Sequence, residues 1–352
     1  MILVVVGHCT YYKIVTRYGG IDYDSAMQLA GVADTYAHRF TSHISTIIYT
    51  FHMPLFMAIS GAVFELGLRR GKYTAACEFL RNKIRRLLVP FLAVTVIYSS
   101  PLKYLSGYWD GSSSLFTDIF IGQILVQGNT HLWFLAALFC EFILFWLLVF
   151  RGSLGERNAV IVMALLFMLC MPARQIPINI IAYTCEFGIY FYTGMLFEKY
   201  RSYLNSRITI KCVFCLLLLW MGLFGGHYLL GHEATTWAKV LKRSDEIAMA
   251  FAGMATFYGA IFVALRNNML KGHWISLLSR DSMGIYLYSD SLNYVILAVF
   301  ASIFTVVGLG NESLSFGLYI ARFVVTFFGG VLVTRVVRFI LSFFIMQDIS
   351  KE

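Results

Sequence analysis

The sequence has little charge and little proline. Only 13% of its 352 residues are Asp, Glu, Lys or Arg and 5 are Pro, whereas 59% are hydrophobic. A soluble domain carries about 25% charged residues, and a disordered chain has the opposite balance of charge and hydrophobicity. These shortages exclude a soluble protein and a string of domains on flexible linkers. They leave a polytopic protein embedded in a lipid bilayer.

The common cofactor and metal motifs are also missing. The chain has no P-loop, no Rossmann glycine fingerprint, no HExxH and no nucleophile elbow. Cys212 and Cys215 have CxxC spacing, but they lie in an apolar run without a second pair, so we interpret them as small apolar residues. We therefore expect no metal. The net charge of +9 is typical of cytoplasmic loops in a membrane protein, so we expect no nucleic-acid partner.

Long apolar runs recur along the whole chain. Nine of them lie near 43–67, 87–105, 132–150, 158–171, 177–197, 209–230, 246–265, 283–307 and 316–345. A tenth run, Met1–Tyr12, rises only about 18 Å against roughly 30 Å of hydrocarbon. The alternating pattern of a membrane barrel is absent, and only helices otherwise satisfy the backbone in lipid. The sequence predicts an all-α fold, a single bundle of about ten transmembrane helices over residues 1–352.

Lys and Arg are distributed unevenly between the alternate loops. One set of loops, which includes 69–86 and 199–211, holds roughly twice as many of them as the other set. The richer side is predicted to be cytoplasmic, with both termini on it. The loops 13–42, 106–130 and 231–245 are then predicted to face outward.

Several ionisable residues lie inside or at the edge of these runs. They are His8, His52, His131, Glu141, Glu186 and Asp290. A charge within a membrane is costly, so each residue is a candidate for function. Each histidine can also be a structural residue that is hydrogen-bonded to a neighbouring backbone group or serine. A buried neutral histidine suits the removal of a proton from a hydroxyl group.

A basic segment, RNKIRRLLVP, precedes the run at 87–105. Its four cations are Arg81, Lys83, Arg85 and Arg86. They serve either as a signal for cytoplasmic orientation or as a clamp for the phosphates of a nucleotide or coenzyme A.

Six segments of the chain form an informative set. They are VVVGHC around His8, FHMPLFMAISGAVF at 51–64, KIRRLLVPF at 83–91, HLWFLAALF at 131–139, FYTGMLFEK at 191–199 and LLSRDSMGIYLYSDSLNY at 277–294. Together they resemble the membrane acyltransferase 3 family, which O-acylates carbohydrates and other acceptors in bacteria. The segments follow the order of the family with similar spacing, and the resemblance covers nearly the whole chain. The resemblance also implies a bundle of about ten helices.

The resemblance implies a catalytic role for His8. Two positions depart from the family pattern. An Arg eleven residues before His8 would fall before Met1, so we expect the first helix to be truncated at its N-terminus. A histidine that follows the IYL stretch in many members is Ser289 here, with Asp290 beside it. Asp290 or His52 could take over its work.

The predicted function is O-acetyl transfer from acetyl-CoA to a glycan hydroxyl outside a bacterial inner membrane. The phosphates of coenzyme A would meet the four cations at 81–86, and His8 would act as the base or carry the acyl group. Ser60, Trp133 and Tyr286 would line the passage of the thioester. The expected partners are an acyl-CoA, a carbohydrate or glycan-lipid acceptor and proteins of polysaccharide assembly.

Two other classes stay open. A transporter of a small anionic or sugar-like solute would also use buried His, Asp and Glu, although the sequence shows no convincing inverted repeat. A sensor or scaffold would show no dependence on acyl-CoA.

Overall fold

The computed structural model describes residues 1–109, 111, 114–150, 152, 154, 156–229, 235–270 and 273–349, without the side chains of 156, 273–278 and 341–349. The chain forms two compact units. Unit 1 contains Met1–Ile48, Pro90–Leu132 and Gly272–Glu352, and unit 2 contains Tyr49–Val89 and Trp133–Lys271.

Within the described ranges, 8 helical stretches are long and apolar enough to cross a membrane. They are Tyr36–Arg69, Ala76–Leu105, Trp133–Phe150, Asn179–Lys199, Ile210–Leu229, Thr236–Arg266, Ser279–Phe304 and Glu312–Ile340. The predicted run at 158–171 is a shorter apolar helix within Ala159–Gln175. The all-α membrane class is confirmed.

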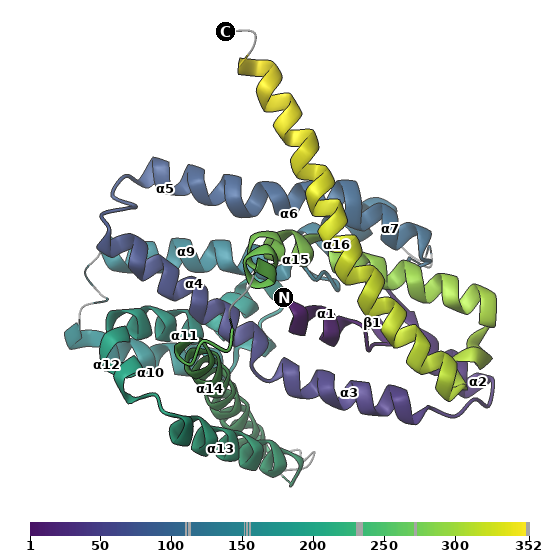
Figure 1. Cartoon of the computed structure of the whole chain (residues 1–352), viewed down its shortest axis with the longest axis horizontal. Helices are drawn as coiled ribbons and strands as arrows, with labels where there is room; N and C mark the ends of the chain where they lie inside the picture. The colour runs from purple at the N-terminus through teal and green to yellow at the C-terminus, as the bar shows by residue number, and fades with distance from the viewer. Residues whose placement is uncertain are drawn as a thin grey trace. The chain divides into compact units, whose positions relative to one another are not determined.

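Unit 1 carries both ends of the chain. Its elements are α1 (Ile2–His8), β1 (Lys13–Thr16), β2 (Gly19–Asp22), α2 (Tyr23–Leu29), α3 (Tyr36–Tyr49), α6 (Val89–Val94), η2 (Thr95–Ser99), α7 (Ser100–Leu105), α8 (Leu115–Thr117), η3 (Asp118–Ile124), α15 (His273–Phe304), η6 (Val306–Gly310) and α16 (Glu312–Ile349). The long helices α15 and α16 pack against each other, and α1 packs against both (Figure 1).

The contact between α15 and α16 depends on small residues. A Cβ atom at Gly284 of α15 would lie 2.0 Å from Thr334 Oγ1 of α16, and one at Gly330 would lie 3.3 Å from the Ile285 backbone. Helices in membranes approach closely where such residues face each other. This contact fixes α15, which carries Asp290, against α16, which carries Arg322.

The segment predicted as the outer loop 13–42 is largely ordered. It forms an antiparallel hairpin with Lys13 opposite Asp22, followed by α2 and the first turns of α3. The Gly20 N–H donates to the Tyr108 carbonyl at 2.8 Å, and Ile21 packs into a core with Tyr12 and Tyr108. Strands of four residues are too short to show a clear alternation, so the sequence did not reveal them.

All the regular elements among the described residues of unit 2 are helices. Its elements are α4 (His52–Arg69), α5 (Ala76–Lys83), η1 (Ile84–Leu88), α9 (Trp133–Phe150), η4 (Glu156–Asn158), α10 (Ala159–Cys170), η5 (Ala173–Gln175), α11 (Asn179–Lys199), α12 (Arg201–Arg207), α13 (Ile210–Leu229) and α14 (Thr236–Arg266). Helix α14 begins ten residues before the predicted apolar run because its first turns are polar and are capped by Thr235.

The crossing of α4 and α11 also rests on glycine. A Cβ at Gly61 would lie 1.9 Å from the Phe191 carbonyl oxygen, and one at Gly194 would lie 1.8 Å from the Ala58 carbonyl oxygen. The backbones of α4 and α11 are therefore in contact at both glycines.

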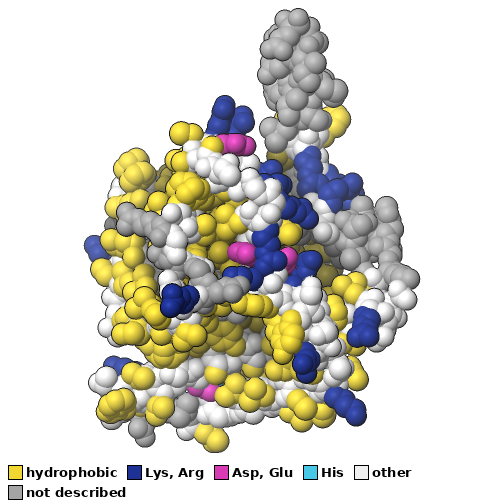
Figure 2. All heavy atoms as spheres, turned by 90° about the vertical axis from the view of Figure 1, so that its left-hand side faces the viewer, with side chains coloured by type: hydrophobic (Ala, Val, Ile, Leu, Met, Phe, Trp, Pro, Cys, Tyr) yellow, Lys and Arg dark blue, Asp and Glu magenta, His cyan; other side chains and the backbone are white. Residues whose placement is uncertain are grey.

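Many large hydrophobic side chains remain on the surface of the chain, and Figure 2 shows a face on which they cover a wide area. Such a surface suits contact with lipid.

Candidate active site

His8 and Asp290 form the centre of the candidate site in unit 1. His8 is the last residue of α1, and Asp290 lies within α15. The His8 ring donates a hydrogen bond from Nδ1 to Asp290 Oδ1. The side chain of His8 is 15% exposed and that of Asp290 is 4% exposed. The pair is therefore largely removed from water, with the imidazole as its more accessible member.

His131 supplies a second imidazole to the same carboxylate. Its Nδ1 lies 3.2 Å from Asp290 Oδ2, which is ion-pair distance, although the angle does not complete a hydrogen bond. Its Nε2 faces the Leu287 carbonyl at 3.2 Å. A carbonyl can only accept, so Nε2 carries a proton. Each oxygen of Asp290 thus faces one histidine.

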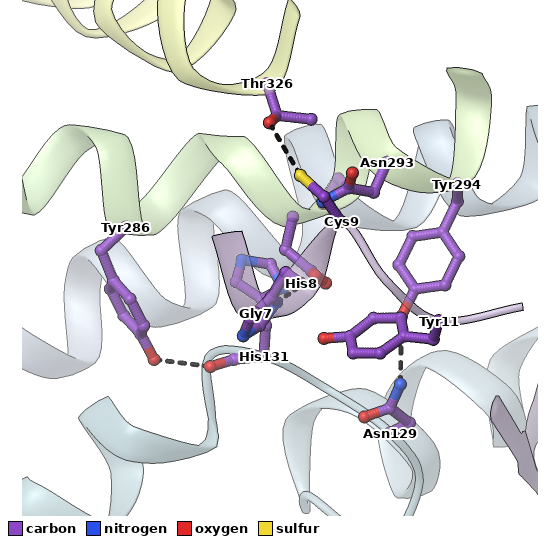
Figure 3. Close-up of polar contacts among 12 residues, drawn as sticks. Gly7, His8, Cys9, Tyr11, Asn129, His131, Tyr286, Asn293, Tyr294 and Thr326 are labelled. Carbon is purple, nitrogen blue, oxygen red and sulfur yellow. Dashed lines mark hydrogen bonds and ion pairs between the residues drawn. The ribbon is translucent and has the colours of Figure 1, made fainter. Parts of the chain in front are cut away.

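Helix α15 also fixes the backbone around His131. The Tyr286 hydroxyl donates to the His131 carbonyl at 2.5 Å (Figure 3). Tyr286 and Leu287 precede Asp290 by about one turn, so one stretch of α15 contacts both the backbone and the ring of His131. The predicted site residue Tyr286 therefore lies in the site, as a partner of the segment that carries His131.

Lys103 holds the loop that leads to His131. Its ammonium group donates to Gln123 Oε1 at 2.8 Å and to the Asn129 carbonyl at 2.7 Å. Lys103 is fully buried, and its charge lies over the rings of Tyr108 and Tyr294 at 4.5 and 5.3 Å.

Both tyrosine hydroxyls also bond Asn129, and that of Tyr108 donates to the Asn129 carbonyl at 3.4 Å. Asn129 Nδ2 donates to the Tyr294 hydroxyl at 3.0 Å (Figure 3). Burial raises the pKa of Tyr108, so its phenol stays neutral beside Lys103.

The chemistry of the pair follows from its tautomer. A carboxylate only accepts hydrogen bonds, so the neutral His8 ring carries its proton on Nδ1 and its lone pair on Nε2. The negative charge of Asp290 stabilises the imidazolium that forms when Nε2 takes a proton, as the aspartate of a hydrolase triad does. The arrangement can therefore act as a general base.

Three other predicted site residues belong to unit 2. His52 is buried at the start of α4, with the Tyr49 ring at 4.8 Å. The Ser60 hydroxyl donates to the Phe56 carbonyl of its own helix at 2.8 Å. The Trp133 ring lies against Tyr183 and Phe187 at 4.3 and 5.1 Å. Their roles stay predictions, and the contacts of Ser60 and Trp133 are those of ordinary packing.

The four cations at 81–86 do not share one environment. Arg81, Arg85 and Arg86 are exposed, whereas Lys83 is buried. The Lys83 ammonium lies 3.2 Å from the centre of the Phe142 ring and 5.0 Å from that of Tyr73. Only the three arginines present their charge to the surface, and the predicted contact with coenzyme A remains a prediction.

The two glutamates marked in the sequence have different surroundings. Glu186 pairs with Arg243 at 2.8 Å and with Arg174 at 3.0 Å, so ion pairing explains its place. Glu141 is fully buried, and neither carboxyl oxygen has a hydrogen-bond partner among the described residues.

Among the described residues, no group of three or more His, Cys, Asp and Glu side chains could hold a metal ion.

Sequence reasoning missed part of the site. The sequence marks His131 as an ionisable residue at an apolar run without assigning it a catalytic role, and it assigns no role to Lys103 or Arg322, which lie in the runs at 87–105 and 316–345. All three are at least 94% buried. A positive charge at the edge of an apolar run was the available signal for the two cations.

The fold and the site define a class: a helical membrane protein with a buried histidine–carboxylate pair. The family model of the acyltransferase 3 domain matches residues 1–335. The chain belongs to this family and is a membrane acyltransferase. No curated protein and no solved structure matches it.

Proposed function

We propose that the chain transfers an acetyl group from acetyl-CoA to a carbohydrate hydroxyl on the outer side of a bacterial inner membrane. Membership of the acyltransferase 3 family supports acyl transfer, and the His8–Asp290 pair carries the proposal because it provides a base for the hydroxyl. Both termini are proposed to lie in the cytoplasm. The acceptor is a surface polysaccharide or exopolysaccharide, or its lipid-linked precursor.

The pair accounts for every proton in the reaction. His8 Nε2 takes the proton of the acceptor hydroxyl while the oxygen attacks the thioester carbonyl. The tetrahedral intermediate collapses, the C–S bond breaks, and the His8 imidazolium returns the proton to the sulfur of coenzyme A. Asp290 keeps the ring oriented and stabilises its positive charge during the reaction. The products are the ester and free coenzyme A.

The donor is proposed to bind through its phosphates. The exposed guanidinium groups of Arg81, Arg85 and Arg86 suit phosphate oxygens, because each presents several N–H donors in a plane. Lys83, which lies among aromatic rings, would support this segment from inside.

The test compares single substitutions in the full chain reconstituted in lipid. The donor is acetyl-CoA, and the acceptor is an envelope polysaccharide extract that mild alkali has stripped of O-acetyl groups. We expect His8→Ala to abolish transfer. His43→Ala is the matched control, since His43 is exposed on α3 and bonds its own helix, and it should transfer at the wild-type rate. Unchanged transfer by His8→Ala would refute the role of His8.

Donor binding is measured separately. Coenzyme A should bind the wild-type chain saturably, and a double Arg85→Gln, Arg86→Gln variant should bind it at least tenfold more weakly. No binding to the wild type would favour a transporter or a scaffold over an enzyme.

A further inference from the structure

Arg322 is a buried cation that contacts neutral groups. It lies on α16 and is 1% exposed. Its guanidinium donates to the carbonyl oxygens of His8 at 3.3 Å and Tyr11 at 3.1 Å, and to Asn293 Oδ1 at 3.3 Å. No carboxylate of the described residues forms an ion pair with it. Burial of a guanidinium without an acidic partner costs free energy. If this position served only for packing, an apolar side chain would be more stable there.

Two hydrogen bonds from Arg322 to backbone carbonyls hold the C-terminal end of α1 in place. His8 is the last residue of this helix, and the carbonyls of a last turn have no partner within the helix. Arg322 supplies donors to the carbonyl of His8 itself and to that of Tyr11 just beyond it. A cation at this end of a helix is also favoured electrostatically.

A third hydrogen bond from Arg322, to the side chain of Asn293, connects it to α15. Asn293 follows Asp290 by three residues, so the two side chains lie on the same face of the helix. One guanidinium on α16 therefore contacts the backbone of the base and the helical turn that carries its carboxylate. Figure 3 shows His8, Cys9 and Asn293 close together.

The neighbours of Arg322 reinforce this link. Thr326, one turn further along α16, donates to the Arg322 carbonyl at 2.6 Å and lies 3.8 Å from the sulfur of Cys9 (Figure 3). Cys9 is 1% exposed. A small cavity is lined by Arg322, Cys9, His38 and other residues of unit 1. Truncation of Arg322 to Ala would enlarge this cavity and make room in it for an added guanidinium ion.

We propose that Arg322 is the positioning residue of the acyl-transfer site. It locks the end of α1 to α15, so that His8 Nδ1 stays on Asp290 and Nε2 stays directed at the acceptor hydroxyl. Arg322 does not touch the reacting atoms; it acts through the His8 backbone. This inference rests on the function proposed above.

The first test is kinetic and uses the reconstituted full chain with acetyl-CoA and the de-acetylated polysaccharide extract. Arg322→Ala should lower kcat at least 30-fold and change the KM for acetyl-CoA less than twofold, because the base is misplaced while the donor contacts remain. Guanidinium at millimolar concentration should restore part of kcat to Arg322→Ala and none to His8→Ala. A wild-type kcat in Arg322→Ala, or a lowered kcat that guanidinium leaves unchanged, would overturn the proposal.

The second test does not depend on activity. N-ethylmaleimide labelling of Cys9, read by peptide mass spectrometry, should be at least ten times faster in Arg322→Met than in the wild type. Arg335→Met is the control, because Arg335 lies on the same helix and pairs with Asp281 instead, and it should label like the wild type. Asn293→Ala, which keeps the cation, should give an intermediate rate.

The two tests separate the inference from the proposed function. A wild-type chain that shows no transfer, together with the expected labelling of Cys9, would refute the proposed function and keep the link between α16 and α1. Equal labelling of Cys9 in the wild type, Arg322→Met and Asn293→Ala would overturn the positioning role.

Discussion

His8 donates a hydrogen bond to Asp290 across 282 positions of the chain. The two residues meet because α1 packs against α15 and α16, which are held together at Gly284 and Thr334. The imidazole thus depends on helices from the opposite end of the sequence.

Asp290→Asn should lower kcat about 10²- to 10⁴-fold, as loss of the carboxylate does in other histidine–carboxylate pairs. An amide can present its NH₂ group to Nδ1, which places the proton on Nε2 and removes the base. The measurement is steady-state transfer with acetyl-CoA and the polysaccharide extract, and the KM for acetyl-CoA should stay within about twofold. A kcat equal to that of the wild type would show that His8 does not rely on Asp290.

The sequence predicted the membrane class, the helical runs and the two members of this pair, each for a physical reason. Long apolar runs have one solution in lipid, and a charged residue inside such a run is marked by its cost. The sequence did not show which charges meet. His8, Asp290 and Arg322 come from three separate helices, and only the tertiary packing reveals that they share one cluster.

Glu186 and Lys103 are two further charged residues whose partners the sequence does not show. Glu186 carried the same signal as Asp290, yet it forms ion pairs with Arg174 and Arg243. Lys103 lies near the end of the apolar run at 87–105, where the sequence shows no partner for it, yet it is fully buried against Gln123 and Asn129. Hydropathy detects a charge near an apolar run, but it does not say whether a partner comes from elsewhere in the chain.

Lys103→Met should loosen the segment that carries His131. The substitution keeps the length of the side chain but removes the donors to Gln123 Oε1 and the Asn129 carbonyl. A buried acceptor such as Gln123 Oε1 that is left without a donor costs about 1–3 kcal/mol, whereas the Asn129 carbonyl keeps its hydrogen bond from the Tyr108 hydroxyl at 3.4 Å. We expect a lower melting temperature in detergent and slower transfer. The control is Lys239→Met, since Lys239 is exposed on α14. Equal melting temperatures for Lys103→Met and the wild type would contradict this role.

Gly194→Leu should prevent the assembly of unit 2. A side chain at this position meets the Ala58 carbonyl oxygen at 1.8 Å, and backbone atoms on a packed helix have no room to move aside. We expect little monodisperse protein on size-exclusion chromatography after extraction. Gly225→Leu is the matched control on α13, where a Cβ meets nothing within 4 Å. Normal recovery of Gly194→Leu would show that α4 and α11 do not need this contact.

The hairpin of unit 1 should respond to acid through Asp22. This carboxylate pairs with Lys13 at 2.7 Å and caps α2 by accepting from the Ser25 N–H at 2.8 Å. The hydrogen bond from Lys13, followed by that from Ser25, lowers the pKa of Asp22 from 3.8 to about 2. A lowered pKa means that the stabilisation is complete above pH 4 and is lost as the pH falls toward 2.

Asp22→Asn keeps a good N-cap but removes the ion pair, so its hairpin amides should exchange hydrogen faster than those of the wild type at pH 6. The difference should shrink at pH 2, and an equal difference at both pH values would show that the charge of Asp22 does not hold the hairpin.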